Sequence, residues 1–182
     1  MARNIEIKAG IDSVESLLQP AAAIADEGPV AIRQDDTFFN CGTGRLKLRV
    51  FNAAEGELIF YRRADRQGPK ESFYLRSPTS APEVLRESLA LAYGIAGRVK
   101  KQRILFLAGR TRIHLDRVEG LGDFLELEVV LDDSESAALG EEEAFELMRK
   151  LGVDRSRLID VAYVDLLART GVQGPPASGQ SG

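Results

Sequence analysis

The chain has 182 residues, of which 44% are hydrophobic and 29% charged, and its formal net charge is -4. This is typical of one globular domain that buries about 70% of its unfolded surface. The negative charge argues against a general binder of nucleic acid or anionic membrane, since both need excess positive charge. No apolar run approaches a membrane helix of roughly 20 residues, residues 1–5 have no signal-peptide core, and the single Cys41 cannot form an internal disulfide. We therefore expect a cytoplasmic protein.

The spacing of apolar residues predicts about eight strands interrupted by helices. In chain order we expect a strand at 4–8, a helix at 12–25, a strand at 30–40, a hairpin of 45–51 with 57–63, a turn at 65–69, a strand at 71–77, a helix at 82–93, strands at 96–107, 111–118 and 123–131, and helices at 134–151 and 158–169. Asp12-Ser13 and Pro82 are typical helix starts, and Gly28-Pro29 is a typical stop. Neighbouring strands joined as hairpins favour an α+β fold, with an antiparallel β-barrel and helices packed outside it. Residues 1–170 would form one domain, and residues 171–182, rich in Gly, Ser, Pro and Gln, a disordered tail.

Several of these strands place their charged residues on one face. Glu6 and Lys8 are two residues apart and so share one face of a strand, as do Glu126 and Glu128. Basic residues recur with the same period of two in the runs 45–49 and 99–103. A solvated outer face is the ordinary interpretation. So many full charges at this spacing also fit a closed sheet with a polar interior and an apolar outside under helices, which is the interpretation that we favour.

The acidic residues suggest a metal. Carboxylates two apart on a strand lie about 7 Å apart, and neighbouring strands add partners about 5 Å away, so converging oxygens would suit Mg²⁺ or Mn²⁺. The candidates are Glu6, Asp116, Glu126 and Glu128. Zinc is disfavoured, because one Cys and one His cannot make a usual zinc site.

The basic residues suggest phosphate, because Arg and Lys side chains fixed side by side can hold several phosphate oxygens. The candidates are Lys8, Lys47, Arg49, Lys101 and Arg103, with Arg62 or Arg63 depending on how that strand ends. Together the acids and bases predict a polyphosphate ligand. His114 is expected to be a surface residue or a hydrogen-bonded structural residue more often than a general base, and Cys41 a turn residue. The phenylalanines Phe38, Phe39, Phe51, Phe60 and Phe106 are expected to serve packing, although one could flank a base or ring.

These residues resemble the CYTH, or triphosphate tunnel metalloenzyme, superfamily. Asn4-x-Glu6-x-Lys8 resembles its N-terminal E-x-E-x-K signature, Val99-x-Lys101-x-Arg103 its central V-x-K-x-R, and the block from His114 to Glu128 its C-terminal metal-binding block. The matches occur in family order between about residues 4 and 131. The last block is the specific one. Asn4 stands where the signature has its first Glu, and its amide can ligate a hard cation but brings no charge.

The resemblance implies a barrel enclosing a tunnel, in which basic side chains bind a triphosphate and acidic ones a divalent metal. Carried across, the metal ligands would be Glu6, Asp116, Glu126 and Glu128, the phosphate-binding residues Lys8, Lys47, Arg49, Arg62, Lys101 and Arg103, and the catalytic residues Lys8 and Glu6. Family members include class IV adenylyl cyclases, thiamine triphosphatases, inorganic tripolyphosphatases and RNA triphosphatases.

We expect a class IV adenylyl cyclase-like enzyme that converts ATP to cyclic AMP and pyrophosphate with Mg²⁺ or Mn²⁺. The alternatives are a hydrolase of tripolyphosphate, thiamine triphosphate or a nucleoside triphosphate, and a non-catalytic module that binds polyphosphate or nucleotide. The expected partner is such a triphosphate, with no nucleic acid or membrane, and the chain could form a homodimer.

Overall fold

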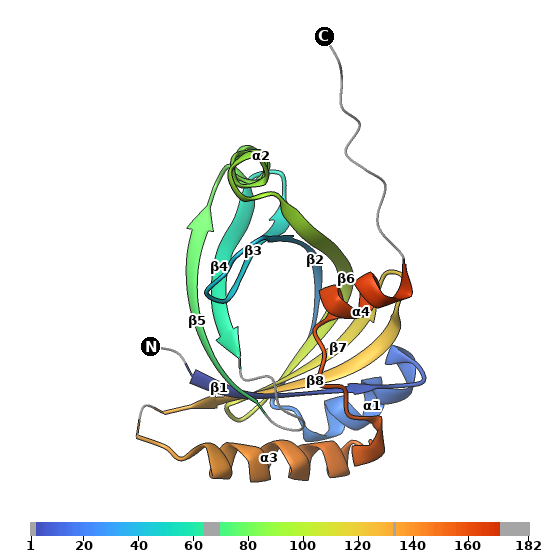
Figure 1. Ribbon diagram of the computed structural model, residues 1–182. Helices are drawn as coiled ribbons and strands as arrows, with labels where there is room; N and C mark the ends of the chain where they lie inside the picture. The colour runs from blue at the N-terminus through green and yellow to red at the C-terminus, as the bar shows by residue number, and fades with distance from the viewer. Residues whose placement is uncertain (1–2, 64–69, 133, 172–182) are drawn as a thin grey trace.

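The computed structural model describes residues 3–63, 70–132 and 134–171, and in this part of the chain eight antiparallel strands close into a barrel (Figure 1). The strands are β1 (Arg3–Gly10), β2 (Glu27–Phe39), β3 (Arg45–Asn52), β4 (Glu55–Arg63), β5 (Lys70–Thr79), β6 (Ile95–Ala108), β7 (Thr111–Val118) and β8 (Gly122–Leu131). The helices are α1 (Val14–Ile24), α2 (Pro82–Tyr93), α3 (Ala137–Lys150) and α4 (Tyr163–Thr170). The predicted α+β barrel is confirmed.

The first strand closes the barrel. Around the ring the order is β1-β5-β4-β3-β2-β6-β7-β8, so β1 pairs with β5 on one side and with β8 on the other. In the β1–β8 register, Glu6 lies opposite Glu128 and Lys8 opposite Glu126. Residues from the two ends of the chain thus become direct neighbours on one wall.

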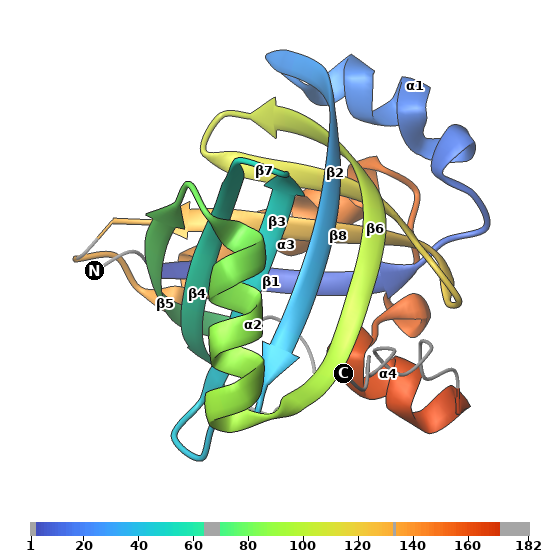
Figure 2. The ribbon, with the colours of Figure 1, turned by 90° about the horizontal axis from the view of Figure 1, so that it is seen from above.

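The apolar core lies outside the barrel wall. Helices α1 and α3 cover β1, β7 and β8, where Ile5, Ile113 and Leu127 are fully buried, and α2 covers β2 and β3 over Leu48 (Figures 1 and 2). Because side chains alternate along a strand, burying these aliphatic residues outward turns their charged neighbours inward. This is the arrangement that the charge pattern predicted.

Local signals explain where the helices begin. Ser13 caps α1 by accepting a hydrogen bond from the amide of Ser16, and the Asp123 carboxylate accepts another from the amide of Val14 at 2.7 Å. Pro82 occupies the first turn of α2, where its missing N–H costs nothing. No helix of the described residues is long and apolar enough to cross a membrane.

Two sequence predictions of element bounds were wrong. The last helix begins at Tyr163 instead of residue 158, because Leu158 pairs with Ala9 at the end of β1 and a short 3-10 turn, Arg155–Arg157, precedes it. The second strand begins at Glu27, with a register irregularity between Glu27 and Val30 where Pro29 has no N–H to donate. The predicted turn at 65–69 and, from residue 172, the predicted tail lie outside the described residues.

Candidate functional site

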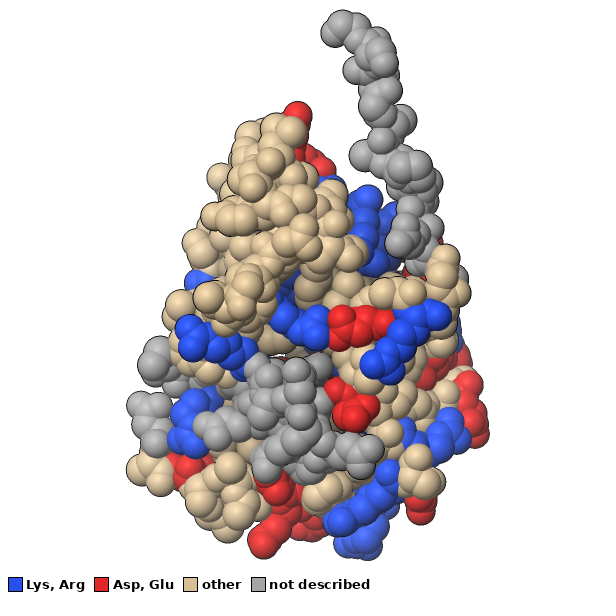
Figure 3. Space-filling model, in the orientation of Figure 1, with Lys and Arg blue, Asp and Glu red and all other residues tan. Residues whose placement is uncertain are grey.

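A cavity of about 370 Å³ lies inside the barrel and collects charged side chains from its wall. Seven basic and five acidic side chains of the described residues line it: Lys8, Lys47, Arg49, Arg76, Lys101, Arg103 and Arg112, and Glu6, Asp36, Glu57, Glu126 and Glu128. On the face seen in Figure 3, by contrast, blue and red side chains are interspersed over the described residues without a large area of one sign. A larger surface hollow, about 560 Å³, lies along α3 outside the barrel. The convergence of opposite charges places the candidate site inside the barrel.

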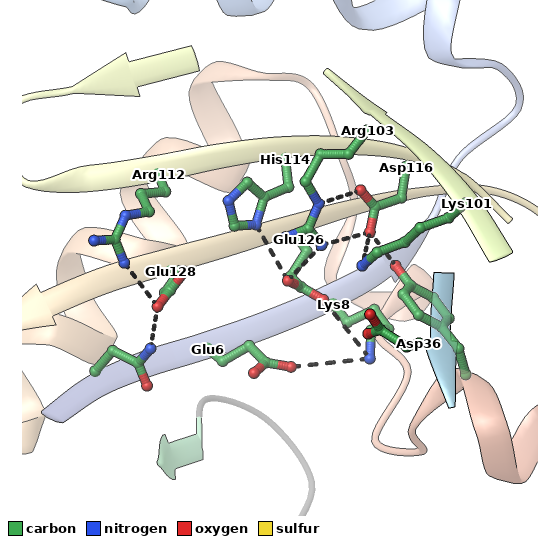
Figure 4. Close-up of polar contacts among 12 residues, drawn as sticks. Glu6, Lys8, Asp36, Lys101, Arg103, Arg112, His114, Asp116, Glu126 and Glu128 are labelled. Atoms are coloured by element: carbon green, nitrogen blue, oxygen red, sulfur yellow. Dashed lines mark hydrogen bonds and ion pairs between the residues drawn. The ribbon is translucent and has the colours of Figure 1, made fainter. Parts of the chain in front are cut away.

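Asp116 on β7 is the centre of a buried cluster with Lys101 and Arg103 on β6, which we call the Asp116 triad. Arg103 Nε donates to Asp116 Oδ1 at 2.6 Å, Arg103 Nη2 to Oδ2 at 2.6 Å, and Lys101 Nζ to Oδ2 at 2.9 Å (Figure 4). Burial alone would raise the pKa of Asp116, but Arg103 and Lys101 hold it below its usual range. The carboxylate is fully buried and does not line the cavity. This placement favours a counterion that orients Lys101 and Arg103, instead of the metal ligand that the resemblance implied.

A second cluster of the same composition lies on the neighbouring strands β2 and β3, where β2 pairs directly with β6, and the sequence did not reveal its acid. Asp36 on β2 accepts from Lys47 Nζ at 2.7 Å and from Arg49 Nε and Nη2 at 2.8 Å each, forming the Asp36 triad with these two β3 residues. Despite burial, Arg49 and Lys47 keep the pKa of Asp36 well below its usual range. Burial and the neighbouring Arg49 lower the pKa of Lys47 to about 8, against the opposing effect of Asp36.

The β1–β8 wall carries a row of oxygen donors. Lys8 Nζ lies 3.9 Å from both Glu6 Oε1 and Glu126 Oε2, and Glu126 also accepts from Arg103 Nη2 at 2.9 Å. One residue pair further along, Glu128 accepts from Arg112 at 3.0 Å and from the amide nitrogen of Asn4 (Figure 4). Glu6, Glu126 and Glu128 therefore lie on one wall, as predicted.

This row has the donor chemistry of a site for a hard divalent cation. Because the nitrogen of Asn4 donates to Glu128, its oxygen is left buried without a hydrogen-bond partner in the described residues. That oxygen and three carboxylates are all ligands that Mg²⁺ and Mn²⁺ prefer. Within residues 3–63, 70–132 and 134–171, no three His, Cys, Asp or Glu side chains converge as a preformed cluster. Glu126 and Glu128 instead contact the cations of Arg103 and Arg112.

His114 lies beside this row. Its Nδ1 is 3.2 Å from Glu126 Oε1, and burial together with the nearby Arg103 lowers the pKa of its imidazole, against the opposing effect of Glu126. The ring is therefore neutral at pH 7. The expected hydrogen-bonded histidine is thus observed, and it lines the cavity. Cys41 instead lies near Thr43 in the β2–β3 turn.

Aromatic side chains line the side of the cavity formed by β2 to β5. Phe38, Phe51, Tyr61 and Tyr74 all face it, and Lys47 Nζ lies 5.5 Å from the Phe38 ring centre and 5.6 Å from that of Tyr61. Packing had been expected of the phenylalanines. Phe39 and Phe106 are buried in the core outside the barrel wall, and Phe38 also packs in a buried cluster, although it faces the cavity, as Phe51 does.

Arg62, which was predicted to bind phosphate, does not line the cavity. On β4 the cavity-lining residues are Glu57, Ile59 and Tyr61, so Arg62 belongs to the opposite face, where its exposed guanidinium lies 5.6 Å from the Phe60 ring centre. The side chain of Arg63, the other candidate, lies outside the described part of the chain. Two basic cavity-lining residues were not predicted from the sequence: Arg76 on β5, which contacts Glu57 at 2.6 Å, and Arg112 on β7, which contacts Glu128 at 3.0 Å.

Comparison with known proteins gives a family and a fold. Residues 2–163 match the CYTH domain family. No curated protein matches the sequence. A conserved hypothetical protein from Pyrococcus furiosus superimposes with a TM-score of 0.80 at 25% identity, over 90% of this chain and 99% of the other.

Two further solved structures are similar in fold. For a proposed adenylate cyclase from Vibrio parahaemolyticus the TM-score is 0.74 at 18% identity, over 91% of this chain and 97% of the other. For a proposed adenylyl cyclase from Hippeastrum, described as having a dominant triphosphatase activity, the TM-score is 0.63 at 16% identity, over 97% and 98%. At these identities the likeness shows the shared barrel.

Proposed function

Because this chain belongs to the CYTH domain family, we propose that it is a divalent-metal-dependent enzyme that acts on a triphosphate inside its barrel. The match over residues 2–163 confirms the family resemblance seen in the sequence. The observation that carries the proposal is the cavity itself, where seven basic side chains of the described residues face one space beside a row of oxygen donors. A chain of phosphates is a ligand whose charge and length match such a lining.

Two walls would hold the phosphates. Lys101 and Arg103, oriented by Asp116, approach from β6, and Lys8 approaches from β1, while Lys47 and Arg49 approach from β3. An anion between these walls would take donors from several strands at once, and charge-assisted hydrogen bonds are the strong ones. Asp116 would act by fixing the direction of these donors.

The metal would be held by Glu6, Glu126 and Glu128 with the free amide oxygen of Asn4. When bound, Mg²⁺ or Mn²⁺ supplies charge neutralisation and polarisation of a phosphoryl oxygen. Glu6 belongs to this row and also lies 3.9 Å from Lys8, so we propose these two residues as the catalytic pair: Lys8 would stabilise charge that develops on phosphate, and Glu6 would keep Lys8 in place.

For the reaction, we propose the cyclase-like conversion of ATP to cyclic AMP and pyrophosphate. The aromatic side of the cavity supports this reaction, because a nucleobase can stack on aromatic rings whereas a polyphosphate has no ring that could do so. The rings are those of Phe38, Phe51, Tyr61 and Tyr74. The ribose 3′-hydroxyl would attack the α-phosphorus, and the Lys and Arg side chains would stabilise the charge on departing pyrophosphate.

Product identification tests the proposal. The purified protein with Mg²⁺ or Mn²⁺ is incubated with ATP, tripolyphosphate and thiamine triphosphate. Cyclic AMP with pyrophosphate supports the cyclase, orthophosphate would mean a hydrolase, and binding without turnover a non-catalytic module. Failure to bind any of the three would contradict the triphosphate site. Lys8→Met should abolish turnover, while Arg62→Met, the matched control on the outer face, should retain it.

Calorimetric titration with Mn²⁺ tests the metal ligands separately. Glu128→Gln is nearly isosteric and removes one anionic ligand, so the affinity should fall at least tenfold without loss of fold. Asn4→Asp adds an anionic oxygen where the amide oxygen has no partner and should tighten binding. Unchanged Mn²⁺ affinity in both variants would mean that the row does not bind metal.

A further inference from the structure

Helix α4 lies against β6 at the edge of the barrel and is held there by contacts from several strands (Figures 1 and 2). Just before the helix, the amide of Ile159 donates to the carbonyl of Lys8 at 2.8 Å, and Leu158 pairs with Ala9. Within the helix, Asp165 contacts Arg45 at the start of β3 at 2.6 Å. The position of α4 relative to β1 is thereby fixed at Lys8, one of the proposed phosphate-binding residues.

Gly97 on β6 lets the helix approach the barrel wall. A Cβ atom at residue 97 would lie 2.6 Å from Val164 Cγ2, closer than side chains can pack. Val164 is a short, stiff side chain, so it could not easily move aside. The contact between α4 and β6 therefore requires the absence of a side chain at this position.

The first residue of α4, Tyr163, enters the cavity as a result. Its ring centre lies 4.2 Å from Lys8 Nζ and 5.1 Å from Lys101 Nζ, and its hydroxyl donates to Asp116 Oδ2 at 3.2 Å (Figure 4). The ring packs against Phe124 with centres 4.9 Å apart. An ammonium group within about 6 Å of a ring centre is attracted to the ring face, most strongly where water is excluded. Burial and the nearby Asp116 raise the pKa of Tyr163, so its hydroxyl remains a donor.

We infer that Tyr163 is a positioning residue, whose ring holds the ammonium groups of Lys8 and Lys101 at the α4 end of the cavity and whose hydroxyl helps to fix Asp116. A role of Tyr163 in catalysis rests on the proposed triphosphate site, whereas the contacts of its ring with the two lysines exist without a ligand. One aromatic side chain thus connects the closing helix to cations on β1 and β6, which are not adjacent in the barrel.

Limited acetylation of the full chain by acetic anhydride, followed by peptide mass spectrometry, tests this hold without any ligand. In Tyr163→Leu, labelling of Lys8 and Lys101 should rise about tenfold, because the ring contact is lost. Lys47, which lines the same cavity but has its ring contacts with Phe38 and Tyr61, and Lys150 on the surface are internal controls and should stay within about twofold. Tyr163→Phe keeps the ring and should protect Lys8 as the wild type does. Equal labelling in wild type and Tyr163→Leu would overturn the assignment.

Gly97→Ala provides a second variant in case Tyr163→Leu does not fold. It changes no cavity-lining residue but displaces Val164, and so should raise labelling of the same two lysines, whereas no change would contradict the link through α4. Titration with tripolyphosphate then tests whether Tyr163 contributes to ligand binding. The affinity should fall about tenfold in Tyr163→Leu and less than about threefold in Tyr163→Phe. If the wild type binds neither tripolyphosphate nor ATP nor thiamine triphosphate, the proposed function fails, while the labelling result still decides the positioning role.

Discussion

The barrel contains two triads of one composition in different surroundings. In each, a Lys and an Arg two residues apart on one strand hold an Asp of the neighbouring strand at 2.6 to 2.9 Å. The side chains of Asp116, Lys101 and Arg103 expose 0%, 5% and 7% of their surface, whereas Asp36, Lys47 and Arg49 expose 4%, 14% and 14%. The Asp116 triad is also covered by the Tyr163 hydroxyl and joined by Glu126. Residues of the same types thus form a more buried triad on β6 and β7 and a less buried one on β2 and β3.

The balance of charge differs in the same direction. Glu126 supplies the Asp116 triad with a second anion, so its two cations face two carboxylates. In the Asp36 triad the two cations share one carboxylate. Burial, and after it the charge of Arg49, lower the pKa of Lys47 to about 8, and burial and Arg103 also lower the pKa of Lys101. We therefore expect the Asp36 triad to contribute most of the electrostatic attraction to a bound anion, and the Asp116 triad to hold its hydrogen-bond donors in a fixed orientation.

The largest expected effect is on stability. Asp116→Asn leaves Lys101 and Arg103 buried with a neutral partner, and breaking a buried ion pair in this way costs ~3–5 kcal/mol of unfolding free energy. Asp36→Asn should cost less, because Lys47 and Arg49 are each 14% exposed to solvent, against 5% for Lys101 and 7% for Arg103. Urea denaturation of both variants measures the difference. Equal losses would mean that the two triads serve the same structural purpose.

The second effect is on ligand affinity and has the opposite sign. Asp36→Asn removes the anion that competes for Lys47 and Arg49, so metal-free tripolyphosphate should bind about tenfold more tightly at pH 7. Asp116→Asn, where it folds, should bind no more tightly, because it loses the orientation of Lys101 and Arg103. Calorimetry measures both. Weaker binding by Asp36→Asn would show that Asp36 positions its two partners instead of competing for them.

The third effect is a pH dependence centred on Lys47. Its pKa is about 8 in the folded protein and 10.5 in the unfolded chain. Below pH 8 Lys47 is charged and can bind an anion, so tripolyphosphate affinity should fall several-fold as pH rises through about 8. Between pH 8 and 10.5 the unfolded chain binds more protons than the folded one, so this residue makes the free energy of unfolding rise with pH. Lys47→Met should show neither slope. A wild-type profile parallel to that of Lys47→Met would exclude Lys47 as the group responsible.

The sequence predicted the barrel and much of this site because both depend on alternation along single strands. Glu6, Lys8, Lys47, Arg49, Lys101, Arg103, Glu126 and Glu128 all line the cavity as their spacing indicated. The same alternation could have placed Arg62 outside, since counting in twos from Tyr61 assigns it to the face of Phe60. The alternation did not decide between Arg62 and Arg63, because the sequence left the direction of the end of β4 open.

Features that depend on pairing between strands could not be predicted. Asp36 stands in the run Gln34-Asp35-Asp36, where nothing in the sequence says which acid faces Lys47 across the β2–β3 register. Asp116 has the residue type of a metal ligand, and only the register of β6 with β7 shows it opposite Arg103. The role of Tyr163 depends on where α4 begins, and that start is set by the pairing of Leu158 with the end of β1.

The smallest expected effect concerns the aromatic rings beside Lys47. These rings lie near the lysine of the Asp36 triad, as the Tyr163 ring lies near the lysine of the Asp116 triad. The Phe38 and Tyr61 ring centres lie 5.5 and 5.6 Å from Lys47 Nζ, near the outer limit of about 6 Å for a cation–π contact, at a more exposed ammonium. Phe38→Leu and Tyr61→Leu should therefore each change tripolyphosphate affinity less than about threefold, or roughly 0.6 kcal/mol. Both variants should retain the fall in affinity near pH 8, because the charges that lower the pKa of Lys47 remain. Calorimetric titrations at pH 7 and pH 9 measure both quantities. A tenfold loss in Phe38→Leu would make Phe38 a second positioning ring, and the two triads would then differ only in burial.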